Sequence, residues 1–298
     1  MGVYVVTSPM TAPQSFNREF LLGGNRLVTR MGFGAMQLVG AVLRGSAAIR
    51  QARALLRTAV ELGVSHIDTS DYYERHVVND LIRQTLFPYP DDLALVTKVG
   101  YELTGDEMLR PATCKSDLVQ AVHDNLKHLG ADRLDIVNLR MTPKSRRASN
   151  GTAEPFSVLA DLQRNGLIEH LGISNVSAEQ LTQARSVAPA VCVRNRYSVA
   201  DRTDDPLVDT CSNLGIAYMP FGPLTGATHS QTTLRSVAQS LGATRAQIAL
   251  AWLMQRSPTM MPIPGTSSGA HMRENVASAD IKLTPRVVTE LNNVAAGR

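Results

Sequence analysis

The stretch Leu93-Ala94-Leu95-Val96-Thr97 is an apolar run of strand length, and a charged residue, Lys98, follows it directly. The same arrangement recurs in Leu134–Leu139, which Arg140 follows. Short apolar runs that end in polar or glycine-containing turns are typical of buried parallel strands. We therefore predict a strand in both places, each with a charge at its carboxyl end.

Comparable runs alternate with helical patterns along almost the whole chain. Further strands are predicted at Met31–Phe33, Ser65–Ile67, His170–Ile173, Val191–Val193, Ile216–Met219 and Met260–Ile263, with helical patterns such as Ala47–Leu62, Lys115–Leu129 and Gln247–Gln255 between them. Eight strands with intervening helices predict an α/β fold that closes into a (β/α)8 TIM barrel. A doubly wound sheet is disfavoured, because no GxGxxG motif follows the first strand and no linker divides the chain.

The domain organisation expected from these patterns is one barrel domain over residues 19–298, preceded by a loosely ordered arm over residues 1–18. The net charge of +4 is spread along the chain and no recognition motif accompanies it, so we expect no nucleic-acid partner. No apolar run is long enough to cross a membrane. An odd number of unpaired, widely spaced cysteines indicates a reducing, cytoplasmic location: Cys114, Cys192 and Cys211.

The charges at the strand ends are the candidates for chemistry. Asp68, Lys98 and Arg140 each close an apolar run, and active sites of such barrels lie at the carboxyl ends of the strands. A buried ion pair between Asp68 and Lys98 is the structural alternative. Tyr73, five residues after Asp68, favours catalysis, because a phenol beside an ammonium can donate a proton to a carbonyl oxygen. For that role Lys98, held by Asp68, must outweigh the effect of burial on the pKa of the phenol.

Five segments of the sequence resemble motifs of the aldo-keto reductase family. Two contain the candidate catalytic residues, and three lie later in the chain. The active-site segments are His66-Ile67-Asp68-Thr69-Ser70-Asp71-Tyr72-Tyr73 and Val96-Thr97-Lys98-Val99-Gly100. The segments similar to that family's cofactor site are Leu171-Gly172-Ile173-Ser174-Asn175, Tyr218-Met219-Pro220-Phe221-Gly222-Pro223-Leu224, and Ile263-Pro264-Gly265-Thr266-Ser267-Ser268 through Glu274-Asn275.

The resemblance implies reduction of an aldehyde or ketone to an alcohol, with hydride from a nicotinamide dinucleotide. It makes Asp68, Tyr73 and Lys98 three members of the family's catalytic tetrad. Arg140 stands where most members have His, and it stays protonated, so it can orient a carbonyl oxygen or an anionic group but cannot shuttle a proton. A bacterial subgroup that includes pyridoxal reductases is similar in its Asn-Leu-Arg ending.

The resemblance also implies the cofactor site and NADPH in preference to NADH. Ser174 and Asn175 would hold the carboxamide, Phe221 would stack on the nicotinamide, and Glu274 and Asn275 would face the adenine. The full set expected to contact the cofactor is Gly34, Ala35, Met36, Asp68, Ser174, Asn175, Arg194, Phe221, Gly222, Pro223, Leu224, Gly265, Thr266, Ser267, Ser268, His271, Glu274 and Asn275.

Three of these positions depart from the common family pattern. Gly265 and His271 replace Lys and Arg, which weakens the expected grip on a 2′-phosphate, and Arg194 replaces a Gln that usually contacts the carboxamide. The Gly265–Ser268 segment also fits a phosphate site of a barrel on physical grounds. An ordinary serine-capped helix start is the alternative for that segment.

Other readings stay open at this point. Arg140 and Arg194, near Lys144, Arg146 and Arg147, suggest an electropositive mouth for an anionic substrate, unless these charges are solvated and point apart. A non-catalytic or very slow NADPH-binding regulatory subunit is the alternative function. Metal-assisted hydrolysis is disfavoured, because no HxH or HExxH spacing occurs. The physiological substrate depends on the loops Tyr101–Ala112, Met141–Glu154 and Thr225–Gln231, and the oligomeric state is left open.

Overall fold

Parallel strands form the central sheet in the part of the chain that the computed structural model describes, residues 18–105, 108–142, 151–226 and 232–293. Within these ranges the sheet has seven strands in the order β11-β10-β9-β8-β5-β4-β3. Each overlaps one of the strands predicted from the sequence. Their bounds are β3 (Phe33–Gly34), β4 (His66–Asp68), β5 (Ala94–Val99), β8 (Leu134–Arg140), β9 (Ile168–Ser174), β10 (Ala190–Arg194) and β11 (Ala217–Tyr218).

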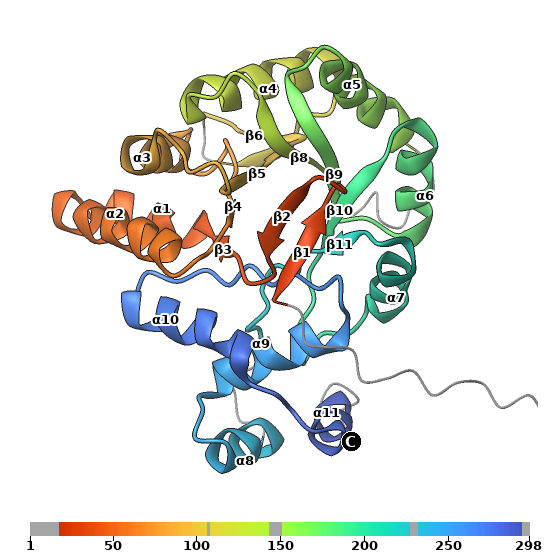
Figure 1. Ribbon diagram of the computed structural model, residues 1–298. Helices are drawn as coiled ribbons and strands as arrows, with labels where there is room; N and C mark the ends of the chain where they lie inside the picture. Colours follow the sequence, from red (N-terminus) through yellow and green to blue (C-terminus); the bar gives the residue numbers. More distant parts are fainter. Residues whose placement is uncertain (1–17, 106–107, 143–150, 227–231, 294–298) are drawn as a thin grey trace, which may run out of the picture.

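The segment 259–264 closes this sheet into a barrel. On one side, the Tyr218 amide donates to the Thr259 carbonyl at 2.9 Å, and the Tyr218 carbonyl accepts from the Met261 amide at 2.8 Å. On the other side, the Gly32 amide donates to the Pro262 carbonyl at 2.9 Å. Figure 1 shows the strands as a ring inside a ring of helices. The first and last strand positions are therefore neighbours, as the predicted (β/α)8 barrel requires.

The prediction of a regular eighth strand at Met260–Ile263 is wrong in detail. Only Met260 pairs there, as an isolated parallel bridge with Tyr218. Pro262 and Pro264 carry no N–H group, so this segment accepts hydrogen bonds from its neighbours but donates fewer in return. The position in the barrel is the predicted one, whereas the ladder is incomplete.

Amphipathic helices cover the outside of the barrel. The helix predicted at Lys115–Leu129 has those bounds, and Gly130 ends it in the left-handed conformation that glycine adopts at low cost. The bounds are α1 (Val39–Leu43), α2 (Ser46–Glu61), α3 (Val77–Leu86), α4 (Lys115–Leu129), α5 (Ala153–Arg164), α6 (Ala178–Val187), α7 (Asp205–Leu214), α8 (Thr232–Ser240), α9 (Arg245–Arg256), α10 (Gly269–Ala277) and α11 (Pro285–Asn292), with 3-10 turns at Ala35–Leu38 and Ser278–Asp280. No helix in the described ranges has the length and apolar character of a membrane span.

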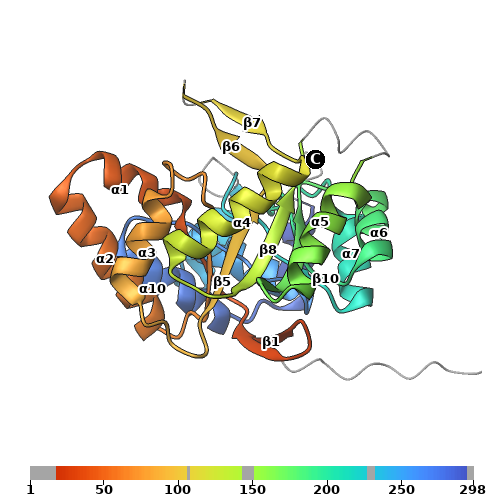
Figure 2. The same ribbon diagram turned by 90° about the horizontal axis from the view of Figure 1, so that it is seen from above.

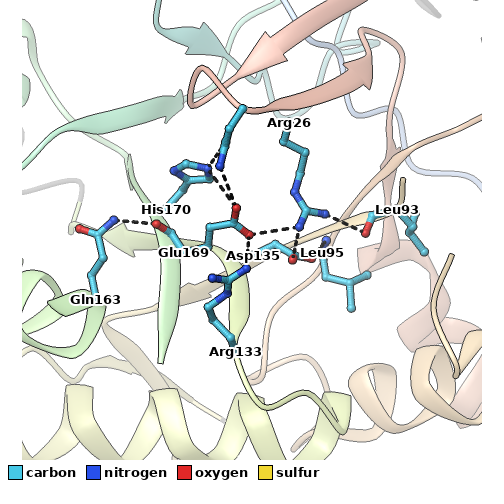
Figure 3. A network of polar contacts seen from close by, with 9 residues as sticks. Arg26, Leu93, Leu95, Arg133, Asp135, Gln163, Glu169 and His170 are labelled. Atoms are coloured by element: carbon cyan, nitrogen blue, oxygen red, sulfur yellow. Dashed lines mark hydrogen bonds and ion pairs between the residues drawn. The ribbon is translucent and has the colours of Figure 1, made fainter. Parts of the chain in front are cut away.

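A hairpin of β1 (Glu19–Leu22) and β2 (Arg26–Thr29), which the sequence analysis did not predict, covers the amino-terminal end of the barrel. Its residues Leu22 and Val28 are buried in one core cluster with barrel-interior residues of four strands. Its turn carries a polar network, in which Arg26 donates to Asp135 at 2.9 Å and to Glu169 at 3.1 Å (Figure 3). The hairpin therefore acts as a plug whose charges pair with the strand starts.

A second unpredicted hairpin, β6 (Tyr101–Leu103) with β7 (Leu109–Pro111), projects from the opposite end of the molecule, as Figure 2 shows. It lies in the first of the three loops expected to set substrate choice. Residues 106–107 of that loop, 143–150 of the second and 227–231 of the third lie outside the described residues, as do residues 1–17 of the predicted arm.

Candidate active site

The inward-facing charges follow from the two-residue repeat of the strands. Ala94 and Val96 belong to the core cluster inside the barrel, so Lys98, two residues further along β5, faces the interior as well. Asp68 ends β4 next to it, and Arg194 ends β10 on the other side of the barrel. Two neighbouring strand ends and one from across the barrel thus bring three ionised groups together at the carboxyl end of the barrel.

Asp68 lies between two cations. Lys98 Nζ donates to its Oδ1 at 2.8 Å, while Arg194 donates from Nε to Oδ2 at 2.9 Å and from Nη2 to Oδ1 at 3.0 Å. Lys98 also donates to the carbonyl oxygen of Thr69. Asp68 and Lys98 are each 1% exposed, and Arg194 is 9% exposed. With Lys98 protonated, this cluster holds one more positive than negative charge, in a region where solvent does not compensate for it.

The protonation of the cluster follows from burial and from these neighbours. Burial alone would raise the pKa of Asp68, but Arg194 and then Lys98 hold it below its usual range. Burial first, and then repulsion by Arg194, lower the pKa of Lys98 to about 7. The ammonium of Lys98 therefore titrates near neutral pH, far below an exposed lysine.

Tyr73 lies beside this cluster, with its ring centroid 5.2 Å from Lys98 Nζ. The side chain is buried, with 8% of its surface exposed. Burial raises the pKa of Tyr73 well above its usual value, and the strongest opposing charge is Arg194. The expectation that Lys98 outweighs burial is therefore wrong for this structure, because burial dominates and the guanidinium is the main counteracting cation.

The loop that carries Tyr73 is held in a strained conformation. Glu74, Arg75 and His76 have φ values of 48°, 46° and 75°, the left-handed region that non-glycine residues rarely adopt. His76 Nδ1 lies 2.7 Å from Asp71 Oδ1, and Arg75 donates to the carbonyl of a residue on the β6–β7 connection. These contacts on both sides of the turn offset the cost of the strain and limit the movement of Tyr73.

Arg140 is held between two tyrosines. Its Nη1 donates to the hydroxyl of Tyr72 at 2.9 Å, and its Cζ lies 4.6 Å from the ring centroid of Tyr101 and 5.5 Å from that of Tyr72. A cation between aromatic faces is attracted by both and keeps its orientation. Neither tyrosine was predicted from the sequence. Tyr72 lies four residues after the end of β4 and Tyr101 two residues after the end of β5, and this position in the loops at the carboxyl ends of strands is the signal that would have identified them.

The predicted electropositive mouth is built differently from the expectation. Arg140 is half-buried at the strand rim, but Arg194 turns inward to Asp68 instead of pointing to solvent. Lys144, Arg146 and Arg147 lie outside the described residues. Among the five cations named for the mouth, the described part of the chain therefore places one, Arg140, at the rim.

Two buried polar groups beside the cluster, near the ends of β8 and β9, define what we call the slot. The amide nitrogen of Asn138 and the hydroxyl of Ser174 are buried without a hydrogen-bond partner in the described part of the chain. Asn175, the next residue, has a φ of 60°. Phe221 is half-buried, with the guanidinium of Arg194 5.0 Å from its ring centroid. Unsatisfied buried donors are costly, so this slot is suited to a polar ligand group.

The predicted phosphate end of the cofactor site lies where the first and last barrel positions meet. A Cβ built on Gly265 would lie 3.1 Å from the carbonyl oxygen of Gly34, so these two segments approach closely. Ser268 caps α10 by accepting from the His271 amide at 3.4 Å, and the Thr266 hydroxyl accepts from the Ser268 amide at 3.0 Å. These hydroxyl contacts are those expected of an ordinary helix cap, the alternative named for this segment. The positive end of the helix dipole would still attract an anion there.

The other predicted cofactor residues occupy the same edge of the barrel. Ala35 is buried and Met36 is 62% exposed at the 3-10 turn after β3, and His271, Glu274 and Asn275 lie on α10, where Asn275 is buried. The remaining residues of the predicted set follow β11 or precede α10: Gly222, Pro223, Leu224 and Ser267. Within the described ranges, no group of three His, Cys, Asp or Glu side chains is placed to hold a metal ion.

Comparisons with known proteins agree with this geometry. The model of the aldo/keto reductase family matches residues 30–296. Pyridoxine 4-dehydrogenase from Escherichia coli (strain K12) is 48% identical over 276 residues, 91% of this chain and 96% of that protein. An uncharacterized oxidoreductase from Schizosaccharomyces pombe is 35% identical over 273 residues, 90% of this chain and 87% of that protein.

Solved structures share the fold. A thermostable aldo-keto reductase crystallised with the inhibitor epalrestat superposes with a TM-score of 0.80 at 27% identity, covering 93% of this chain and 99% of that one. An aldo/keto reductase from Klebsiella pneumoniae has a TM-score of 0.79 at 23% identity, covering 93% of this chain and 95% of that one. The match to the family model and the two sequence relatives establish that this chain belongs to the aldo/keto reductase family.

Proposed function

We propose that the protein reduces an aldehyde or ketone to an alcohol, with NADPH as the hydride donor. The observation that carries the proposal is the position of Tyr73 beside the buried pair of Lys98 and Asp68. A carbonyl oxygen that accepts a hydrogen bond from Tyr73 lies within the field of that cluster. The 48% identity to a protein named pyridoxine 4-dehydrogenase supports the same chemistry.

The residues of the slot fit a nicotinamide. Its carboxamide offers both a donor and an acceptor, which match the unpartnered Ser174 hydroxyl and Asn138 amide. Phe221 offers a face for the ring. A Cβ on Gly265 would lie 2.9 Å from Gln37 Cγ and 3.1 Å from the Gly34 carbonyl oxygen, so a side chain at residue 265 would crowd the approach to the helix start. When bound, the cofactor supplies the hydride that is added to the carbonyl carbon.

Each residue of the cluster then has a defined role. Tyr73 donates its proton to the oxygen as negative charge develops there. Lys98 and Arg194 stabilise the phenolate that remains, because two positive charges are only partly neutralised by the single negative charge of Asp68. Asp68 holds both cations in place. Arg140 orients the substrate and does not exchange its proton.

The test is a titration of the purified protein with NADPH and with NADH, followed by absorbance decay of the nicotinamide band against a panel of aldehydes. We expect oxidation that requires both cofactor and aldehyde, with pyridoxal among the accepted substrates and NADPH preferred. Binding of NADPH without oxidation for any aldehyde would contradict the proposal and favour the regulatory alternative. Binding of neither nucleotide would also contradict it.

We further infer that the substrate carries an anionic oxygen near its carbonyl group. Arg140 has one N–H group engaged by Tyr72, and no other hydrogen bond of its guanidinium is formed to a described residue. Held between Tyr72 and Tyr101, it presents its remaining donors in a fixed fork that suits an oxyanion. Pyridoxal has such an oxygen, a phenolate next to its aldehyde group.

Matched aldehydes test this inference. We expect 2-carboxybenzaldehyde, which carries an anionic oxygen next to its aldehyde group, to show a kcat/KM about tenfold above that of benzaldehyde or 4-carboxybenzaldehyde, and Arg140→Met to remove most of that difference. The conservative variant Arg140→Lys keeps the charge but loses the fork, so it should recover part of the preference. Equal kcat/KM values for all three aldehydes in the unmodified enzyme would contradict the inference without affecting the proposed reduction.

A further inference from the structure

Arg194 is a predicted contact of the cofactor, and it is also part of the catalytic cluster. It makes a two-point hydrogen-bonded ion pair with Asp68, at 2.9 and 3.0 Å, although that carboxylate already accepts from Lys98. A single partner would neutralise Asp68. While Lys98 is protonated, the second cation therefore leaves an uncompensated positive charge in the interior, where it is screened far less than on the surface.

The same guanidinium borders the slot proposed for the nicotinamide. Its Cζ lies 5.0 Å from the ring centroid of Phe221, and Arg194 pairs in the sheet with Ser174, whose buried hydroxyl is unpartnered. A ring that stacks on Phe221 with its amide at Ser174 thus has Arg194 as a neighbour. The charge on that ring then interacts directly with the excess charge of the cluster.

The two oxidation states of a nicotinamide differ in this charge. The oxidised ring is a cation and the reduced ring is neutral, whereas the phosphates, riboses and adenine are the same in both forms. Resting on the proposed function, we propose that Arg194 makes the site discriminate between the oxidation states of its cofactor, binding NADPH in preference to NADP⁺. Like charges in a poorly solvated site repel, and only the oxidised ring experiences that repulsion.

A consequence for turnover follows from this preference. The product cofactor is bound less tightly than the substrate cofactor, so it dissociates readily and inhibits weakly. The enzyme then works as a reductase even where NADP⁺ is abundant, and the reverse oxidation of an alcohol requires a high NADP⁺ concentration. Arg194 acts here as a specificity-determining residue for the cofactor and not as a proton donor.

Equilibrium binding measured by calorimetry below the Lys98 pKa of about 7, at one salt concentration, tests the proposal without relying on activity. The quantity is the ratio of the Kd for NADP⁺ to the Kd for NADPH, in which the shared contacts cancel. We expect a ratio well above one for the unmodified protein and a decrease of about tenfold in Arg194→Gln, the effect of removing one partly compensated charge. Arg194→Lys keeps the charge and should keep most of the ratio.

Arg196→Gln is the matched control, because Arg196 lies over the same Phe221 ring at 5.8 Å but is exposed, so its charge is screened by solvent. It should leave the ratio nearly unchanged. An unmodified protein that binds NADP⁺ as tightly as NADPH would overturn the proposal whatever the variants do. So would a folded Arg194→Gln protein with an unchanged ratio, or an equal decrease in Arg196→Gln. Failure of the unmodified protein to bind either nucleotide would overturn the proposed function as well.

Discussion

At the scale of single residues, the environment of Lys98 determines how the enzyme responds to pH. Its ammonium is buried and shares Asp68 with Arg194, and these two influences lower its pKa to about 7. Below that pH the side chain is a cation beside Tyr73, and above it the side chain becomes neutral. Only the cation stabilises the phenolate that forms when Tyr73 gives up its proton.

We therefore predict that kcat for aldehyde reduction is highest below about pH 7 and declines as the pH rises through that value. Lys98→Met should lower kcat by about 100-fold and should abolish this inflection, because the titrating group is gone. Steady-state kinetics between pH 5 and pH 9, at saturating NADPH, provide the measurement. Lys282→Met, at an exposed position, is the control. An unchanged inflection in Lys98→Met would assign it to another group.

The sequence could predict some of these residues and not others, for physical reasons. Asp68 and Lys98 directly end apolar runs, so the barrel fixes their position once the strands are known. The partner of Arg194 could not be predicted, because Asp68 is 126 residues away and an arginine at a strand end can point inward or outward. The effect of burial on Tyr73 was likewise hidden, since it depends on the packing of the loop after β4.

At the scale of elements, the β1–β2 hairpin is the feature that the sequence pattern did not reveal. Its four-residue strands contain no long apolar run, and they are stabilised by groups far away in the chain (Figure 3). Glu169 accepts from Arg26 at 3.1 Å, from Arg133 at 3.2 Å and from Asn25 at 3.0 Å. Burial alone would raise the pKa of Glu169, but Arg26 and Arg133 hold this pKa below its usual value.

Because its folded-state pKa is lowered, Glu169 stabilises the fold above its unfolded-state pKa of about 4.5, and this contribution is lost as the pH falls through the folded-state value. We predict that Glu169→Gln lowers the free energy of unfolding by about 1–2 kcal/mol at pH 7. At pH 3 the difference from the unmodified protein should be much smaller. Urea denaturation at both pH values measures it. Glu179→Gln, on the exposed face of α6, is the control, and an equal loss at both pH values would contradict the prediction.

At the scale of the whole molecule, Arg30 joins the beginning of the barrel sheet to its last segment. It is 3% exposed, and it donates to the carbonyl oxygens of Met254 at 2.5 Å, Ser257 at 2.6 Å and Met260 at 3.1 Å. Burial lowers its pKa to about 10, so it remains charged at neutral pH. One side chain before β3, the first strand of the barrel sheet, thus donates hydrogen bonds to carbonyl groups at the end of α9 and in the eighth barrel segment.

We predict that Arg30→Met lowers the free energy of unfolding by about 3 kcal/mol or more, because three carbonyl groups lose a charged donor and the Ser257 carbonyl keeps only the bond from the Met260 amide at 3.2 Å. Arg30→Lys should recover only part of the loss, since an ammonium cannot reach three carbonyls in the geometry of the guanidinium fork. Urea denaturation followed by circular dichroism is the measurement. A midpoint unchanged in Arg30→Met would show that the barrel closes without this contact.

The barrel itself was predictable because its alternating pattern extends along nearly the whole chain, whereas its closure depends on contacts between residues more than 200 positions apart. The missing N–H groups of Pro262 and Pro264 explain why the last strand is irregular although its position is the expected one. Sequence periodicity thus identifies the order of the elements, and the buried polar contacts that join them require the structure.

The central claim, that Tyr73 is the proton donor of a carbonyl reductase, is tested most directly by a single-turnover measurement on Tyr73→Phe. The variant removes one oxygen atom and keeps the aromatic ring, so the fold and the affinity for NADPH should change little. We predict that NADPH oxidation by pyridoxal occurs in the unmodified protein and is at least about 100-fold slower in Tyr73→Phe. Equal rates in the two proteins, with NADPH bound to both, would contradict the claim.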